Sequence, residues 1–253
     1  MLQKTTDLPF FRGLPAVLNI AHRGASKRAA EHSMAAYELA LAQGADVLEL
    51  DLRSTRDLTL LVTHDATLER TLGRKEKIAE LSFAELTAAT HGRLPLTLDQ
   101  VLSRFPSARF NLELKDESLE AARALADLLA ARRAEERVLV ASVHRAVLSE
   151  LRSVTSGRVS TSASAQEVLR YYFCYLMEKN CHTPYAALQL PALGWLGLTR
   201  PAFLKHVHAQ GLVVHFWTID DEVTMRDLID AGADGIMTDW PDVLARALSE
   251  RRE

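Results

Sequence analysis

The chain has 253 residues, of which 48% are hydrophobic, and its formal net charge is −3. A chain of this size can bury a substantial core, and an α/β barrel commonly uses about 250 residues as one unit. The nearly neutral charge and the lack of a long Lys/Arg run argue against binding to nucleic acid.

Apolar segments of strand length alternate with helix-like segments along the chain. The expected strands span residues 17–22, 46–53, 59–64, 109–114, 138–143, 158–162, 187–190, 212–217 and 235–238. The expected helices span residues 33–43, 117–133, 145–153, 164–178, 200–210, 221–231 and 241–250. This alternation predicts a parallel sheet, and because no Pro/Gly/Ser-rich linker divides the chain we expect a single domain over residues 1–253.

The nine expected strands are one more than a (β/α)₈ barrel contains. The segments 46–53 and 59–64 are separated by only five residues, whereas parallel neighbours need a crossover of about a dozen. These two segments should therefore form an antiparallel hairpin whose second limb lies outside the barrel ladder. The prediction is an α/β fold, a TIM (β/α)₈ barrel with a hairpin extension after its second strand.

Polar side chains interrupt or close several of these apolar strands. His22 ends the first strand, His64 ends the second limb of the hairpin, and Glu113 lies near the end of the next strand. Glu49 and Asp51 are two residues apart, so both carboxylates point to the same face of their strand. Because sites in such barrels lie at the carboxyl ends of the strands, we expect these five side chains to converge.

These residue types are suited to phosphate chemistry. Three carboxylates without a Cys-rich pattern favour an oxygen-ligated Mg²⁺ or Ca²⁺ over a structural zinc ion. Arg23 follows His22, and Lys115 lies two residues after Glu113, so both offer positive charge for an anionic phosphate. A pair of histidines can divide the roles of general acid and general base. Each motif alone also has an ordinary explanation, such as an ion pair at a strand end, and only their joint placement favours a functional site.

An ordered set of short motifs runs from about residue 18 to about residue 245. It comprises His22-Arg23-Gly24, Glu31-His32-Ser33, Gly44-Ala45-Asp46, Glu49-Leu50-Asp51, His64-Asp65, Asn111-Leu112-Glu113-Leu114-Lys115, Trp217-Thr218-Ile219-Asp220 and residues 232–239. This set resembles the glycerophosphodiester phosphodiesterase family, a branch of the phospholipase-C-like phosphodiesterase barrels. The resemblance implies a TIM barrel and metal-dependent hydrolysis of a phosphodiester.

The resemblance also implies roles for individual residues. It makes His22 and His64 the acid/base pair and Glu49, Asp51 and Glu113 the metal ligands. It places Arg23, Lys115, Glu31 and Trp217 at the substrate: the first two at the phosphate, Glu31 in support, and Trp217 as an apolar wall.

Two departures from the family pattern bear on the substrate. The family's Pro-Glu-Asn-Thr reads here as Ala30-Glu31-His32-Ser33, so an imidazole replaces an amide. If that amide orients a ligand or substrate, either His32 must substitute for it or the substrate preference has changed. Residues 66–100 leave little or no room for a cap insertion, and a reduced cap would leave the pocket more open to a bulky substrate.

The expected reaction is hydrolysis of glycerophosphodiesters to sn-glycerol 3-phosphate and an alcohol. The alternative within the family is a lysophospholipase D that releases lysophosphatidic acid, and a more remote one is a catalytically silent barrel that binds phosphorylated ligands. The sequence does not choose between Mg²⁺ and Ca²⁺, between the two histidines as acid and base, or between direct attack by water and a cyclic intermediate.

The expected partner is a small-molecule phosphodiester. The aromatic-rich segment 171–177 either fills the core or lies near a pocket mouth, where contact with a lysolipid or a membrane surface would follow. We expect a cytoplasmic protein, because residues 1–15 lack the pattern of a secretory signal and no apolar run reaches roughly 18 residues. Cys174 and Cys181 are read as structural thiols, with a single bridge between them left open.

Overall fold

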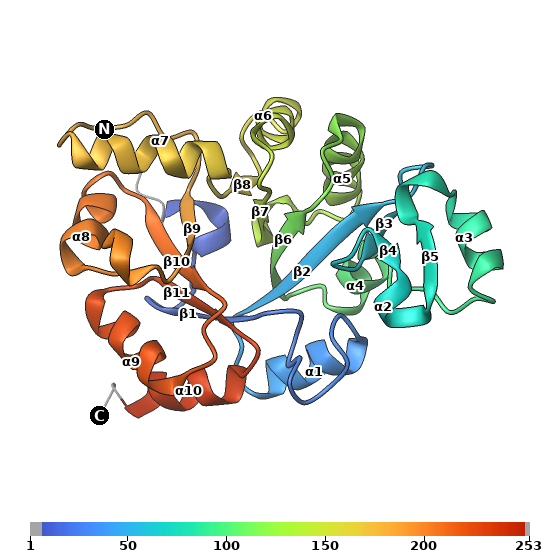
Figure 1. The fold of residues 1–253 in the computed structure, drawn as a ribbon, viewed down its shortest axis with the longest axis horizontal. Helices are drawn as coiled ribbons and strands as arrows, with labels where there is room; N and C mark the ends of the chain where they lie inside the picture. Colours follow the sequence, from blue (N-terminus) through green and yellow to red (C-terminus); the bar gives the residue numbers. More distant parts are fainter. Residues whose placement is uncertain (1–6, 251–253) are drawn as a thin grey trace.

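The computed structural model describes residues 7–250, in which eight parallel strands form a barrel surrounded by helices (Figure 1). The first six and last three residues of the expected domain lie outside this described part. The barrel strands are β1 (Leu18–Ala21), β2 (Val47–Ser54), β6 (Arg109–Leu114), β7 (Val138–Ala141), β8 (Ser160–Thr161), β9 (Ala187–Pro191), β10 (Val213–Trp217) and β11 (Gly235–Thr238). Their order in the sheet is β8-β7-β6-β2-β1-β11-β10-β9.

Backbone contacts between β8 and β9 bring the two ends of this sheet together. The Ala186 amide donates to the Thr161 carbonyl and the Ala163 amide donates to the Ala187 carbonyl, each at 2.8 Å. Ser162 and Ala187 also form an isolated parallel bridge. The predicted TIM barrel is therefore confirmed.

The predicted hairpin is also present. Strand β3 (Leu60–Val62) pairs antiparallel with the end of β2, with Leu52 opposite Val62, and it pairs with no other barrel strand. The Thr63 amide then donates to the Asp51 carbonyl at 3.0 Å. The second limb thus returns the chain to the rim, where His64 follows.

All seven predicted helices are present, with ends shifted by up to two residues. They are α1 (Met34–Ala42), α5 (Leu119–Ala131), α6 (Arg145–Val154), α7 (Ala165–Leu176), α8 (Pro201–Ala209), α9 (Glu222–Ala231) and α10 (Pro241–Glu250). The hydroxyl of Ser33 accepts from the Ala36 amide and so caps α1, and Gly44 takes a φ of 86° after its end. Ser33 is a typical N-cap residue and Gly44 a typical glycine after a helix end, so residues common at helix ends occupy both ends of α1.

Residues 67–104 contain elements that the sequence analysis did not anticipate. They form β4 (Thr67–Leu68), α2 (Glu69–Leu72), β5 (Arg74–Lys77), a 3₁₀ turn η3 (Ile78–Glu80), α3 (Phe83–Ala89) and α4 (Leu98–Arg104). Ser82 with Glu85 and Thr97 with Gln100 form capping boxes that start α3 and α4, and both pairs are visible in the sequence. The unit containing β4, β5, α2 and α3 is small and lies at one side of the barrel (Figure 1).

The period of two along β2 and β6 decides which side chains reach the barrel interior. Leu48, Leu50 and Leu52 belong to the cluster that packs under the helices, whereas Val47 belongs to an interior cluster. Glu49 and Asp51 have the same parity as Val47 and are 1% exposed. The leucines that alternate with the carboxylates therefore pack outward against the helices, while the carboxylates point into the barrel.

The opposite end of the barrel is filled with apolar side chains. Phe10 and Phe11, in the 3₁₀ turn η2 (Pro9–Phe11), pack with interior residues of β1, β2 and β7, including Leu18 and Leu139. This packing closes the amino end of the strands. The cavity beside the predicted site residues lies at the opposite, carboxyl end.

The three tyrosines of the aromatic-rich segment pack against the core, as one of the two interpretations predicted, whereas Leu176 and Met177 at its end are exposed. Tyr171 is fully buried against Phe203, and Tyr175 contacts the same ring at 5.0 Å between centroids. Phe173 is instead exposed, and Cys174 and Cys181 are both free thiols. None of the described helices has the length and apolar character needed to cross a bilayer.

Candidate active site

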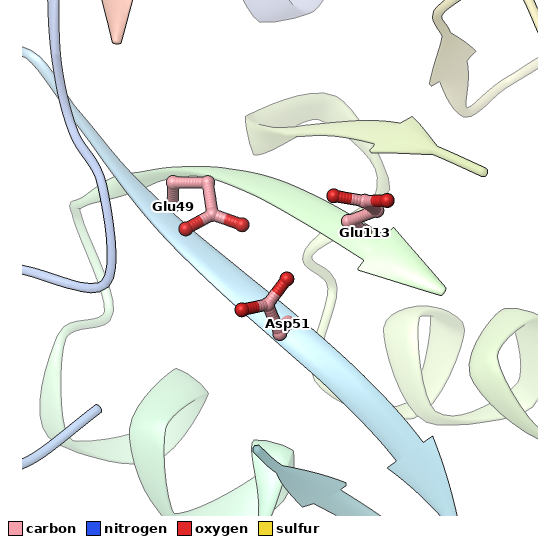
Figure 2. A group of neighbouring side chains, drawn as sticks. All are labelled: Glu49, Asp51 and Glu113. Atoms are coloured by element: carbon pink, nitrogen blue, oxygen red, sulfur yellow. The ribbon is translucent and has the colours of Figure 1, made fainter. Parts of the chain in front are cut away.

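Three carboxylates meet at the carboxyl end of β2 and β6. In the strand register Asp51 lies opposite Glu113, and Glu49 lies opposite Asn111. Figure 2 shows Glu49, Asp51 and Glu113 turned toward one another, and one ligand atom from each lies within 4.8 Å of the others. A set of oxygen donors at this spacing suits a hard divalent cation such as Mg²⁺ or Ca²⁺.

The surroundings of Glu49 and Asp51 act on their two carboxyl groups in opposite directions. Burial, followed by the charges of Asp51 and Glu113, raises the pKa of Glu49 well above its usual value. Burial also acts to raise the pKa of Asp51, but a hydrogen bond from His32 and the charge of Lys115 outweigh it and hold that pKa well below the usual range. The two neighbouring carboxyl groups are thus held in different electrostatic environments.

Two cations contact this cluster. Lys115 Nζ lies 3.0 Å from Asp51 Oδ1 and 2.8 Å from Glu113 Oε2. The Arg23 amide donates to Glu49 Oε2 at 2.9 Å, and its guanidinium Nε lies 3.1 Å from Asp51 Oδ2. The two basic residues expected at the phosphate are therefore held beside the carboxylates.

His22 is fixed by a carboxylate from the other end of the chain. Its Nδ1 lies 2.7 Å from Asp239 Oδ1, just after β11, and its backbone amide donates to the Thr238 carbonyl. Asp239 also accepts from the Ser26 hydroxyl and pairs with Lys27 Nζ at 3.0 Å. Within residues 7–250 the hydrogen bond of this ring is made through Nδ1.

His64 is held in the same way from the hairpin side. Its Nδ1 lies 2.8 Å from Asp65 Oδ1, and Arg70 of α2 contacts Asp65 Oδ2 at 2.6 Å. Arg70 also donates to Glu31, which pairs with Arg23 at 3.4 Å. Glu31 therefore lies in an ion-pair network beside the site and does not line the cavity.

A cavity of about 580 Å³ opens beside these groups. One part of its lining is polar and includes the two histidines together with Arg23, Lys115 and Glu113. The other part is largely apolar and is formed by Ala141, Val143, Ala163, Val168, Leu190, Pro191, Trp217 and Met237. The cavity thus offers a charged end and an apolar wall to one ligand.

Trp217 lies at the end of β10 and is 44% exposed. It shares the inward parity of Val213 and His215, whereas Val214 and Phe216 pack in the outer cluster. Its placement at the cavity supports the role expected from the resemblance. Without the resemblance, the sequence favoured a core position for Trp217.

Several site residues were not singled out from the sequence. Asp239 holds His22, Tyr37 contacts His32, and Gln189 donates to Asn111 at 2.8 Å beside the cavity. These contacts join residues between 5 and 217 positions apart. Only Asp239 lay within a quoted motif, and no spacing rule indicated its partner.

Comparisons with known proteins point to one family. The model of the glycerophosphoryl diester phosphodiesterase family matches residues 22–243. A Mycobacterium tuberculosis protein named "probable glycerophosphodiester phosphodiesterase 2" is 30% identical over 244 residues, covering 92% of this chain and 91% of that protein. A human lysophospholipase D is 27% identical, with 90% of this chain and 84% of that protein covered.

A solved structure shows the same fold. An Oleispira antarctica phosphodiesterase, solved in complex with the product sn-glycerol-3-phosphate, superposes with a TM-score of 0.75 at 24% identity. The superposition covers 93% of this chain and 97% of that one.

Proposed function

The chain belongs to the glycerophosphoryl diester phosphodiesterase family, and from that premise we propose that it hydrolyses glycerophosphodiesters to sn-glycerol 3-phosphate and an alcohol in a cation-dependent reaction. It is a phosphoric diester hydrolase, as its relatives are. The observation that carries the proposal is the carboxylate cluster of Glu49, Asp51 and Glu113 beside a cavity lined by two histidines. The product bound to the Oleispira antarctica enzyme supports the same substrate class.

The carboxylate cluster would hold one divalent cation, either Mg²⁺ or Ca²⁺. All three donors are carboxylate oxygens, and two of them are buried where an uncompensated negative charge is costly. When bound, such a cation neutralises charge on a phosphoryl group and helps to orient it. Arg23 and Lys115 would bind the remaining phosphate oxygens through charge-assisted hydrogen bonds.

His22 and His64 would transfer the protons. Each has its Nδ1 bound to a carboxylate, at 2.7 Å and 2.8 Å, and both line the cavity. Each ring therefore presents Nε2 for proton exchange, one nitrogen accepting the proton of the nucleophile and the other protonating the leaving alkoxide. Detection of a cyclic phosphate in a single-turnover reaction would identify the neighbouring glycerol hydroxyl as nucleophile, and its absence would favour water.

A lysophospholipase D activity is the second candidate, favoured by the apolar part of the cavity. Val168 of α7 and Trp217 line it, and the outer face of α7 carries Leu169, Phe173 and Leu176, which are 57% to 58% exposed. An acyl chain could contact this wall while the phosphodiester lies at the charged end. Lysophospholipase D enzymes are also among the relatives.

The test compares glycerophosphocholine with lysophosphatidylcholine under Mg²⁺, Ca²⁺ and excess chelator. We expect hydrolysis that the chelator abolishes and added cation restores, and the ratio of kcat/KM values separates the two candidates. The variant His22→Ala should lose activity by a factor of about 10² to 10⁴. His144→Ala is the matched control, because His144 lies on the same rim and is not among the cavity residues.

Two results would contradict the proposal. Undiminished hydrolysis after exhaustive chelation would refute the cation requirement. An inactive wild-type protein with every diester and cation tested would favour a barrel that only binds phosphorylated ligands.

A further inference from the structure

A buried imidazole lies directly behind the carboxylate cluster. His32 is 7% exposed, and its Nε2 lies 3.0 Å from Asp51 Oδ2. Its Nδ1 lies 2.9 Å from the hydroxyl of Tyr37, which is itself fully buried in α1. The three residues form a chain of contacts that ends on a proposed cation ligand.

The directions of these hydrogen bonds follow from the partners. An ionised carboxylate only accepts, so His32 Nε2 must carry the proton that is donated to Asp51. In the neutral ring Nδ1 is then an acceptor, and the Tyr37 hydroxyl donates to it. Both ring nitrogens are satisfied in this one tautomer, which the Asp51 carboxylate selects, because a tyrosine hydroxyl can either donate or accept.

The contact also constrains which oxygen of Asp51 faces the cluster. Oδ2 is contacted by His32 Nε2 and by Arg23 Nε. Oδ1 lies 3.0 Å from Lys115 Nζ, which in turn contacts Glu113. Because His32 and Arg23 hold Oδ2, the other oxygen, Oδ1, stays on the side of Glu113.

The backbone at His32 is held in an uncommon conformation to make this contact. Its φ is 56°, in the left-handed region that costs most residues about 1 kcal/mol or more. The His32 amide donates to the Arg23 carbonyl at 3.0 Å, which ties this loop to the one that carries His22. The strained conformation places the imidazole against Asp51.

We propose that His32 is a positioning residue for the cation site: its Nε2–H fixes the Asp51 carboxylate, and the Tyr37 hydroxyl, by donating to Nδ1, holds the His32 ring in place. This inference rests on the proposed function, because it concerns the same cation. Partners that orient a ligand in this way typically contribute a factor of about 10 to 100 to metal affinity.

Binding of Mg²⁺ to the full chain, measured by calorimetry after chelation, tests the proposal. The variant His32→Ala should raise the Kd by a factor of about 10 to 100. His32→Gln should recover most of the loss, because its side-chain amide can extend an N–H toward Asp51. Neither variant places a glycine at position 32, so both keep the backbone cost of the positive φ there. The two variants differ in whether the side chain can donate a hydrogen bond to Asp51.

Tyr37→Phe tests the second link with a minimal change of shape. It should weaken Mg²⁺ binding several-fold, because Nδ1 loses its donor. Tyr171→Phe is the matched control, since Tyr171 is also fully buried and its hydroxyl accepts from Gln210 at 2.8 Å in another part of the fold. Free energies of unfolding measured in chelator separate a loss of affinity from a loss of stability.

Nitrogen chemical shifts of the wild-type protein provide a readout that needs no variant. We expect a protonated Nε2 and an unprotonated Nδ1 at His32, and the opposite tautomer would overturn the proposal. Wild-type affinity for Mg²⁺ in His32→Ala would overturn it while leaving the proposed function intact. A wild-type protein that binds neither Mg²⁺ nor Ca²⁺ would overturn both.

Discussion

His215 should make the stability of this protein depend on pH. The side chain is 1% exposed inside the barrel, and burial lowers its pKa to about 4. Its Nδ1 faces Gln189 Nε2 at 3.4 Å, and the same amide donates to Asn111 at 2.8 Å. A proton on Nδ1 would therefore point at another donor.

The sign and size of the effect follow from the two pKa values. In the unfolded chain His215 titrates near 6.5 and in the folded protein near 4, so between these values the unfolded state binds more protons. The contribution of neutral His215 to the free energy of unfolding is fully present above about pH 6.5 and is lost as the pH falls toward 4. The loss from pH 7 to pH 5 is about 2 kcal/mol, which corresponds to about 4–8 °C in Tm for a domain of this size.

The assay compares wild type with His215→Met by urea unfolding at pH 7, 6 and 5. The substitution removes the titrating group and keeps a flexible side chain that can fill the space. Other groups titrate in both proteins, so the difference between the two free energies isolates His215. We expect that difference to shift by about 2 kcal/mol in favour of His215→Met between pH 7 and pH 5.

His182→Met is the control, because it makes the same substitution at an exposed histidine. A difference between wild type and His215→Met that stays constant from pH 7 to pH 5 would refute the reasoning. It would mean that the buried ring accepts a proton without cost.

Four further predictions test other parts of the structure. Glu49→Gln should abolish the thermal stabilisation by Mg²⁺, which in wild type is about 2.7 kcal/mol at one hundred times the Kd; a retained Tm shift would argue against this ligand. Arg152→Met should cost about 3–5 kcal/mol in urea unfolding, because it leaves the carboxylate of Glu167 buried without its partner at 2.7 Å; a loss below 1 kcal/mol would contradict the inference. Gly24→Ala should destabilise the protein measurably, since φ is 82° and a Cβ would come within 2.8 Å of the α1 backbone; an unchanged Tm would be unexpected. Trp217→Ala should raise KM for lysophosphatidylcholine more than for glycerophosphocholine, and equal effects on both would exclude an acyl-chain contact.

The barrel could be predicted because its signals are local. Leu48, Leu50 and Leu52 alternate with Glu49 and Asp51, and this period of two separates the helix-facing side from the interior before any tertiary contact is known. The five-residue separation between 46–53 and 59–64 similarly required an antiparallel hairpin. The elements within 67–104 were missed because they are short, although the capping boxes at Ser82 and Thr97 marked the starts of two helices.

The sequence by itself determined the strand ladder and the residues that carry its chemistry. It could not determine the partners of those residues, because each partner comes from a distant element: Asp239 reaches His22 only once β11 lies beside β1. His32 likewise reaches Asp51 through a positive φ that no local pattern required. Hydrophobic periodicity is a property of one segment, whereas hydrogen bonds across a closed barrel depend on how all its strands are placed.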